Sequence, residues 1–491
     1  MLDPDVSVTA TTTTSTPDRR SWWVLAAMCV PLLAQSLDVS GIGLLLPSIG
    51  ADLDASATQL AWVMNANALA FGALLLTFGT LADRFGPRRL LLAGVAGFGV
   101  ASLLCGAATD TDVLIAARAL QGLSSAACFT TSLSVVMATF AEDRRPAAIG
   151  VWGAVSGAGS ALGPLVAGAL TTAVGWRAFF FVNGPICLLA LPAIATLVGA
   201  RDRRADRPTA PVPAAGLAAV AVSFVGISLA AGRVGGGSWL SPGTVVPLVA
   251  AAGAGIFVVV RRRRGARPVV DPAAVGARWS RSALAAAFTS TWGFGVTLVV
   301  VSAYLQQVRG FSALEAGVTF LAFSGAFALA GTVNGPAVRR LGLTTTLVAA
   351  MVACAAGFAL LATIAPASAF ALVVLGLLVG GFGQGLAFAA STTASLTGVP
   401  QEASGQATGA TQSTRLLGNV AGVALSTAVL IDLRDGVDTP VALARGDGAA
   451  MVLALGVSLL GAALVPLLVR RGAATPTPTG AAGAGPGSLG A

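Results

Sequence analysis

The chain has 491 residues, of which 55% are hydrophobic and only 10% are charged. A soluble domain carries roughly 25% charged residues, so this composition excludes the soluble globular classes and predicts an integral membrane protein. All 29 cationic residues are Arg and there is no His, which excludes a P-loop lysine, a Schiff-base lysine and the commonest metal ligand and general base.

Residues 1–20 are polar and rich in Thr, and they end in Arg19 and Arg20. No small-residue cleavage site follows the first apolar segment, so we interpret that segment as a retained helix and not as a signal peptide. A membrane-spanning helix needs about 20 mostly apolar residues. Fourteen segments meet that description, at approximately 23–46, 60–81, 90–108, 113–137, 147–170, 179–198, 214–231, 245–260, 284–305, 316–338, 346–364, 368–390, 409–431 and 449–469.

Most of the Arg residues lie in every second loop between these segments. Positively charged loops stay on the cytoplasmic side of a membrane, so we expect a multi-pass protein of the cell (cytoplasmic) membrane with both termini in the cytoplasm. The run Arg261–Arg264 is interpreted as an anchor of this topology, and the alternative is a site for anionic lipid. The formal net charge of +9 follows from the same loops, and we expect no nucleic-acid partner.

The loops also predict how the chain is divided. Two Arg-rich loops flank the seventh and eighth segments, which suggests six helices, a two-helix insert and six more helices. The tail has low sequence complexity and is predicted to be disordered. The expected parts are a cytoplasmic tail (1–22), an N-terminal bundle (23–200), a linker with two inserted helices (201–280), a C-terminal bundle (281–470) and a disordered C-terminal tail (471–491).

The loop between the second and third segments reads GTLADRFGPRR over residues 79–89 and contains Gly79, Asp83, Arg84, Gly86 and Arg88. It resembles the signature loop GxLaDrxGrr of the major facilitator superfamily. A degenerate copy of the same loop occupies residues 331–342 in the second half. The resemblance implies a major facilitator fold, with two pseudo-symmetric six-helix bundles that rock around a central site. It also implies that this loop latches the cytoplasmic ends of the bundles, and the alternative is a plain turn that sets topology.

Helices four and five extend the resemblance. Residues 118–122 read RALQG and resemble the RxxQG element of the superfamily. The fifth helix resembles the antiporter motif, which is found in exporters and generally lacking in importers. Its matching residues are Gly153, Gly157, Gly163, Pro164 and Gly168.

Residues 37–47 partly match the LDxTIVNVALP signature of the 14-helix drug:proton antiporter branch, and residues 413–424 are close to its sRqlGgalGvA element. The resemblance spans essentially 23–470. Acidic residues that some members of the branch carry within the second half have no intramembrane counterpart in this chain.

Three ionisable residues are placed well inside predicted helices: Asp38, Arg118 and Arg415. A charge in the bilayer costs at least ~2.5–3.5 kcal/mol, so we expect a role in proton coupling or substrate binding for each. A carboxylate such as Asp38 could bind and release a proton as the cavity alternates between faces, whereas Arg cannot deprotonate. The alternative for all three is a structural hydrogen-bonding role.

Further polar and aromatic side chains could line a central cavity, although each is individually more typical of a core or lipid-facing position. They are Trp62, Phe71, Gln121, Phe129, Trp152, Trp292, Phe294, Tyr304 and Phe388.

The resemblance implies proton-driven efflux of a hydrophobic or amphipathic drug or antibiotic, by a protein that is not an enzyme. We expect no metal and no cofactor, with protons, a small-molecule substrate and the lipid bilayer as partners, and function as a monomer. The main alternative is proton-coupled uptake of a small metabolite. A polytopic membrane enzyme would need clustered His or acidic residues, and a proton-pumping respiratory subunit would need intramembrane Lys and Glu. This sequence has neither feature.

Overall fold

The computed structural model describes residues 19–198, 213–234, 241–266, 268–271, 275, 279–311, 313–366, 368–400, 403–432 and 440–473. The described part is helical and holds fourteen α-helices and one short π-helical segment. Eleven helices are long and apolar enough to cross a membrane, and the bent α5 makes twelve. Of the other two, α7 has a shorter apolar stretch and α14 carries many polar residues. The fourteen predicted spans are compatible with this fold.

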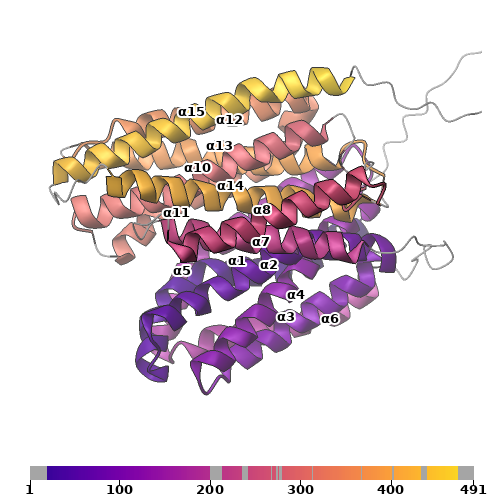
Figure 1. Ribbon diagram of the computed structural model, residues 1–491, viewed down its shortest axis with the longest axis horizontal. Coiled ribbons are helices and arrows are strands. Elements are labelled where there is room, and N and C mark those ends of the chain that lie inside the picture. Colours follow the sequence, from indigo (N-terminus) through magenta and orange to yellow (C-terminus); the bar gives the residue numbers. More distant parts are fainter. Residues whose placement is uncertain are drawn as a thin grey trace, which may run out of the picture.

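Six helices form the N-terminal bundle, drawn in indigo and purple in Figure 1. They are α1 (Arg19–Leu53), α2 (Ala57–Phe85), α3 (Pro87–Gly106), α4 (Thr111–Thr139), α5 (Arg145–Ala173) and α6 (Arg177–Leu197). Their ends are set by local chemistry: Ser56 forms a capping box with Gln59 before α2, and the Asp110 side chain caps α4. A side chain that accepts a free helix N–H stabilises the first turn.

The C-terminal bundle lies on the other side of the molecule, in pink to yellow (Figure 1). It contains α10 (Ser280–Ala303), the π-helical segment η1 (Tyr304–Val308), α11 (Ala313–Leu341), α12 (Leu343–Ala362), α13 (Phe370–Leu396), α14 (Ser404–Asp432) and α15 (Pro440–Ala473).

The two bundles repeat one packing pattern. In the first, α1 packs on α5 and α6, α4 packs on α2 and α3, and α3 packs on α6. In the second, α10 packs on α14 and α15, α13 packs on α11 and α12, and α12 packs on α15. Each of these five contacts of α1–α6 therefore has its equivalent in α10–α15. The main contacts between the bundles, α2 with α14 and α5 with α11, are also equivalent to each other, and so are the smaller contacts of α4 with α14 and of α5 with α13, as expected for an internal repeat.

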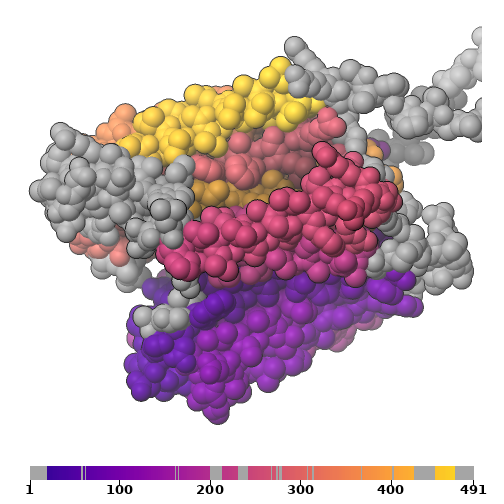
Figure 2. Space-filling view, viewed as in Figure 1, coloured from indigo at the N-terminus to yellow at the C-terminus, as the bar shows by residue number. Residues whose placement is uncertain are grey.

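Helices α7 (Ala214–Val234) and α8 (Pro242–Arg263) pack against each other, and α7 contacts both α2 and α14. They cover the boundary between the bundles on the face shown in Figure 2. A Cβ atom at Gly72 of α2 would collide with the Phe224 ring of α7, so this glycine allows α7 to lie close to the N-terminal bundle. A mostly apolar groove runs along the junction of α7 and α8 and is lined by Val225 and Pro247 among others.

One end of the molecule, which we call the Arg-rich end, carries the α2–α3, α4–α5 and α11–α12 connections and the end of α8. Both described chain ends lie there. Ser21 at the start of α1 donates a hydrogen bond to Thr139 at the end of α4, and Val465 of α15 packs with Leu343 at the start of α12. Helix α1 begins at Arg19, four residues earlier than the predicted span. Residues 474–491, most of the predicted disordered tail, lie outside the described residues.

Candidate functional site

Three of the predicted residues meet in the interior of the N-terminal bundle. Asp38 lies on α1, and Arg118 and Gln121 lie one turn apart on α4. The Arg118 Nη1 atom is 2.5 Å from Asp38 Oδ2, and Gln121 Nε2 donates to Asp38 Oδ1 at 3.1 Å. The exposed fractions of Asp38 and Arg118 are 0% and 1%. The carboxylate thus has both of its oxygens occupied by donors from α4.

Neighbouring polar groups complete this network. Arg118 Nε donates to the carbonyl oxygen of Val63 at 3.2 Å, and Gln121 Nε2 also reaches Ser102 Oγ at 2.9 Å. Asn67 donates to Gln121 Oε1 at 3.4 Å. Gly122 allows α2 to come this close to α4, because any residue with a Cβ at position 122 would overlap the Asn67 backbone. Sequence reasoning did not identify Asn67 and Ser102, because neither residue type is unusual in a membrane helix.

Arg415 is the buried charge of the C-terminal bundle, with an exposed fraction of 4%. Its Nη2 atom donates to Phe388 O at 2.6 Å and to the hydroxyl oxygens of Ser391 and Thr392 at 2.7 Å, and Nη1 donates to Gln412. None of the described acidic side chains lies within ion-pair distance of it. The structure therefore separates Arg415 from the Asp38–Arg118 pair.

Aromatic rings connect the two bundles. Phe71 of α2 packs on Phe129 of α4, and Phe129 packs on Trp152 of α5, with centroid distances of 5.7 and 4.7 Å. Trp152 is stacked on Phe388 of α13 at 6.1 Å, and the Arg415 guanidinium lies 3.9 Å from the Phe388 ring centre. Four aromatic residues thus form a continuous column that ends at Arg415, and all four were expected at a cavity.

The predicted latch loop joins the bundles at the Arg-rich end. Both oxygens of Asp83 accept hydrogen bonds of 3.0 Å from the backbone N–H groups of Gly405 and Gln406, at the start of α14. A helix N-terminus favours a negative charge because its first N–H groups lack intrahelical partners. A Cβ at Gly405 would lie 2.6 Å from the Gly79 carbonyl oxygen, so both glycines are needed for this close crossing.

The other loop residues have further contacts. Gly86 has φ of 88° and allows the turn into α3. Arg88 donates to the carbonyl oxygens of Val198 and Ala195, which ties the loop to α6. Arg84 lies over the ring of its neighbour Phe85.

A second junction at the Arg-rich end involves α5 and α11. A Cβ at Gly331 would lie 2.6 Å from the Gly150 carbonyl oxygen, and Asn334 Nδ2 donates to Pro146 O at 3.0 Å. Asn334 falls in the second-half copy of the latch loop, and that repeat was the signal in the sequence that could have identified it. The two junctions are equivalent under the internal repeat and close this end of the molecule.

The antiporter-motif glycines lie along α5, where they face two different bundles. A Cβ at Gly153 or Gly157 would meet Phe388 or Phe327 of the C-terminal bundle. At Gly163 it would lie 2.6 Å from the Leu37 carbonyl oxygen of α1, next to Asp38, and Gly168 faces Leu44 of the same helix. The side chain of the fifth motif residue, Pro164, lies outside the described residues.

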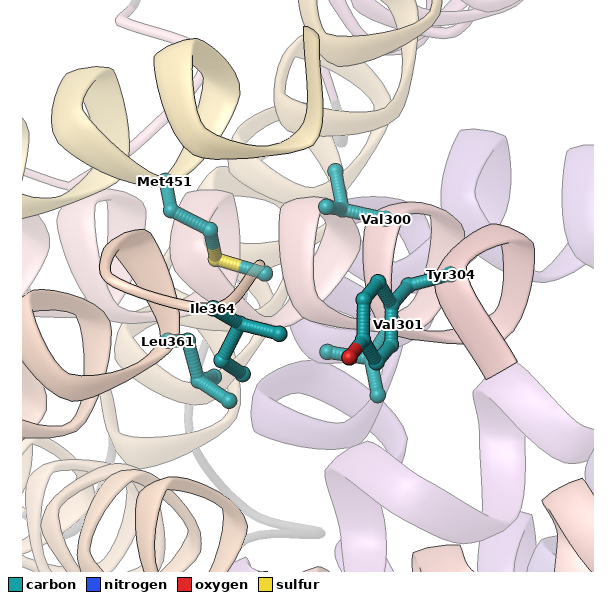
Figure 3. Close-up of a pocket in the computed structure, with 6 residues that line it drawn as sticks. All are labelled: Val300, Val301, Tyr304, Leu361, Ile364 and Met451. Atoms are coloured by element: carbon teal, nitrogen blue, oxygen red, sulfur yellow. The ribbon is translucent and has the colours of Figure 1, made fainter. Parts of the chain in front are cut away.

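The other expected cavity residues are dispersed. Trp62 is 42% exposed near the start of α2, and Trp292 lies partly buried on α10. Tyr304 lines a small cavity near the far end of the C-terminal bundle, together with Val300, Leu361 and Met451 (Figure 3). Its hydroxyl donates to Ala365 O at 2.9 Å, so the ring is held away from the aromatic column.

Comparisons with known proteins agree with this geometry. A sequence model of the Major Facilitator Superfamily matches residues 28–423. The puromycin resistance protein pur8 of Streptomyces alboniger is 34% identical over 480 residues, which cover 92% of each chain. The multidrug efflux pump LfrA of Mycolicibacterium smegmatis is 32% identical, covering 88% of this chain and 85% of its own. In fold, the human organic anion transporter MFSD10 (TETRAN) matches 92% of this chain and 100% of its own with a TM-score of 0.65 and 16% identity.

Proposed function

The chain belongs to the major facilitator superfamily, and we propose that it exports hydrophobic or amphipathic drugs or antibiotics across the cytoplasmic membrane in exchange for protons. It is an integral membrane protein whose relatives carry the names of antibiotic resistance and multidrug efflux proteins. The superfamily is one of transporters, so a small molecule is the substrate.

The observation that carries the proposal is the buried pair of Asp38 and Arg118. Among the described residues, the buried charged side chains are Asp38, Arg118 and Arg415, and Asp38 is the one acid. A proton on Asp38 would remove the charge that holds Arg118 and would weaken the 2.5 Å contact between α1 and α4. Proton binding can thus alter the packing of the bundle that carries the antiporter motif.

The closed Arg-rich end supports an alternating-access cycle. In the proposed orientation this end faces the cytoplasm, and the junctions at Asp83 and Asn334 hold it shut in an outward-facing state. Substrate loading requires these junctions to separate, so that the bundles rock around the aromatic column. We further propose that the protein works as a monomer without a metal or cofactor, driven by the proton gradient, with both termini in the cytoplasm.

The test uses everted membrane vesicles with an acidified interior and a pH-sensitive dye. Adding an exported compound from a panel of lipophilic drugs should release protons from wild-type vesicles and not from Asp38→Asn vesicles. Membranes without the protein control for passive leakage. No release with any compound, from a protein shown to be folded, would contradict drug:proton antiport.

Proton-coupled uptake of a small metabolite is the alternative, and drug accumulation in cells separates the two. An exporter lowers the intracellular drug level when the protein is present, and the difference disappears when the proton gradient is collapsed. An uptake symporter raises the level of its own substrate and leaves the drug level unchanged.

A further inference from the structure

Arg415 carries a positive charge that the described part of the chain does not neutralise. Asp38 and Arg118 form an ion pair and together contribute no net charge. Arg415 is 4% exposed, and its partners are a carbonyl oxygen, an amide oxygen and two hydroxyl groups. These groups solvate a cation but do not compensate it, and an unpaired buried charge is costly. The buried charged side chains of the described residues therefore sum to one net positive charge, which one negative charge would neutralise.

Unused donors lie on α14 itself and on two helices that pack against it. The Nε atom of Arg415 has no hydrogen-bond acceptor, and neither does the amide nitrogen of Gln384, which is 3% exposed. Gln384 lies one turn before Phe388 on α13, so it is on the helix face that contacts Arg415. The indole nitrogen of Trp292 on α10 is also without an acceptor. Buried donors are nearly always satisfied, so these three donors are available to a ligand that supplies an acceptor. The Oδ1 atom of Asn419, one turn after Arg415, is an unpaired acceptor on the same helix.

The aromatic rings near Arg415 also indicate the shape of the ligand that would carry the acceptor group. The Phe388 ring lies against the Arg415 guanidinium and is stacked on Trp152 from the other bundle. Phe327 adds a third ring, 5.6 Å from Phe388. A flat aromatic ligand could stack beside these rings while its charged end approaches Arg415. Because Trp152 belongs to α5 and Arg415 to α14, such a ligand would contact both bundles.

We propose that Arg415 binds the anionic group of the exported compound, and that the substrate is an aromatic amphipathic anion such as a carboxylate or sulfonate. This inference rests on the proposed function and specifies its substrate class. The anion supplies the missing countercharge and an acceptor for the free Nε–H. The bound complex then has a neutral interior, which lowers the cost of moving the charge through the bilayer.

The test measures binding to the purified full-length protein in nanodiscs by energy transfer from tryptophan to pyrene. The probes are 1-pyrenesulfonate, its neutral sulfonamide, and the pyrenemethyl trimethylammonium cation. Wild type should bind the anion at least ~10-fold more tightly than the other two, since a desolvated charge pair is strong. Arg415→Gln should lose this preference, and Arg415→Lys should retain part of it because the charge remains without the planar guanidinium.

Arg281→Gln is the matched control, because Arg281 is an exposed Arg at the start of α10; its preference should equal that of wild type. Equal or tighter wild-type binding of the sulfonamide or the cation would overturn the inference without any variant. A wild-type anion preference that persists in Arg415→Gln would overturn it as well. Proton release triggered by neutral or cationic drugs alone would leave the efflux function standing and exclude Arg415 as its anion site. Tight anion binding without proton release by any compound would instead contradict the efflux function.

Discussion

At the residue scale, the buried ion pair explains why an acid and an Arg are tolerated inside one apolar bundle. Asp38 and Arg118 are 80 positions apart in sequence, yet the Arg118 guanidinium donates a hydrogen bond to the Asp38 carboxylate. Removing one member leaves the other charge uncompensated, which costs more than removing both. The pair can therefore be tested for structure and for proton coupling separately.

Asp38→Asn should destabilise the protein by about 3–5 kcal/mol because Arg118 is left buried and unpaired, and it should abolish drug-dependent proton release. The double variant Asp38→Asn/Arg118→Gln should regain much of the stability, since no unpaired charge remains, and still show no proton release. Thermal unfolding in detergent and the vesicle assay measure the two effects. A double variant that transports normally would show that the pair has no part in coupling.

The sequence identified the residue types of the site but not their partners. A charge in an apolar helix is conspicuous wherever it lies, so Asp38, Arg118 and Arg415 could be predicted from hydropathy alone. Which of them pair depends on how α1, α4 and α14 pack, and that is decided by contacts far apart in sequence. Ser391, Thr392 and Gln412 were missed for the same reason, because Ser, Thr and Gln become solvating groups only when a charge lies beside them.

At the element scale, the predicted helices follow the apolar segments, but the helix ends and crossings needed the structure. Helix α1 continues to Leu53, beyond the apolar segment that ends near residue 46, because polar residues at a membrane surface can extend a helix. The π-helical turn at Tyr304–Val308 could not be predicted, because no pattern of apolar residues distinguishes it from the α-helix before it. The motif glycines predicted close packing, and only the structure shows that those of α5 contact α11 and α13 on one part and α1 on another.

The capping of α14 by Asp83 should control the equilibrium between the two end states. Asp83→Asn keeps one acceptor and removes the charge, which weakens the contact with the α14 N-terminus by about 1 kcal/mol. The open form of the Arg-rich end should therefore become roughly fivefold more populated. Double electron–electron resonance measures this shift as a change in the distance between two spin labels. The labels are attached at Phe85 and Leu341, which are both exposed at that end, in a cysteine-free background. An unchanged distance distribution would argue against the latch.

The α2–α14 crossing should be equally sensitive to a single methyl group. Gly405→Ala places a Cβ against the Gly79 carbonyl oxygen, and backbone cannot yield as a side chain can, so we expect about 1–3 kcal/mol of destabilisation of the closed form and a strong loss of transport. Gly456→Ala is the control, because no atom of another residue lies within 4 Å of the added Cβ on α15. Equal transport by both variants would mean that the helices separate at no cost.

At the scale of the whole molecule, the internal repeat relates the packing of the bundles but not their chemistry. Among the described residues, the N-terminal bundle holds a buried ion pair and the C-terminal bundle holds a buried cation without an acidic partner. Symmetric packing allows the bundles to rock with matched junctions at α2–α14 and α5–α11. By our proposals, the unequal charges place proton chemistry in the N-terminal half and substrate charge in the C-terminal half. The aromatic column, which ends at Arg415, connects the halves in addition to these two junctions.

The same architecture predicts the orientation in the membrane. An even number of helices puts both termini on one face, and the contacts of Ser21 and Val465 place the two ends at the Arg-rich end. Because Arg-rich loops remain cytoplasmic, green fluorescent protein fused after residue 473 should fluoresce, and alkaline phosphatase fused there should be inactive. Phosphatase fused within the α7–α8 loop, after residue 237, should be active. An active phosphatase at the C-terminus would reverse the orientation, and the junctions at Asp83 and Asn334 would then close the outer face of the membrane, which would make the structure an inward-facing state.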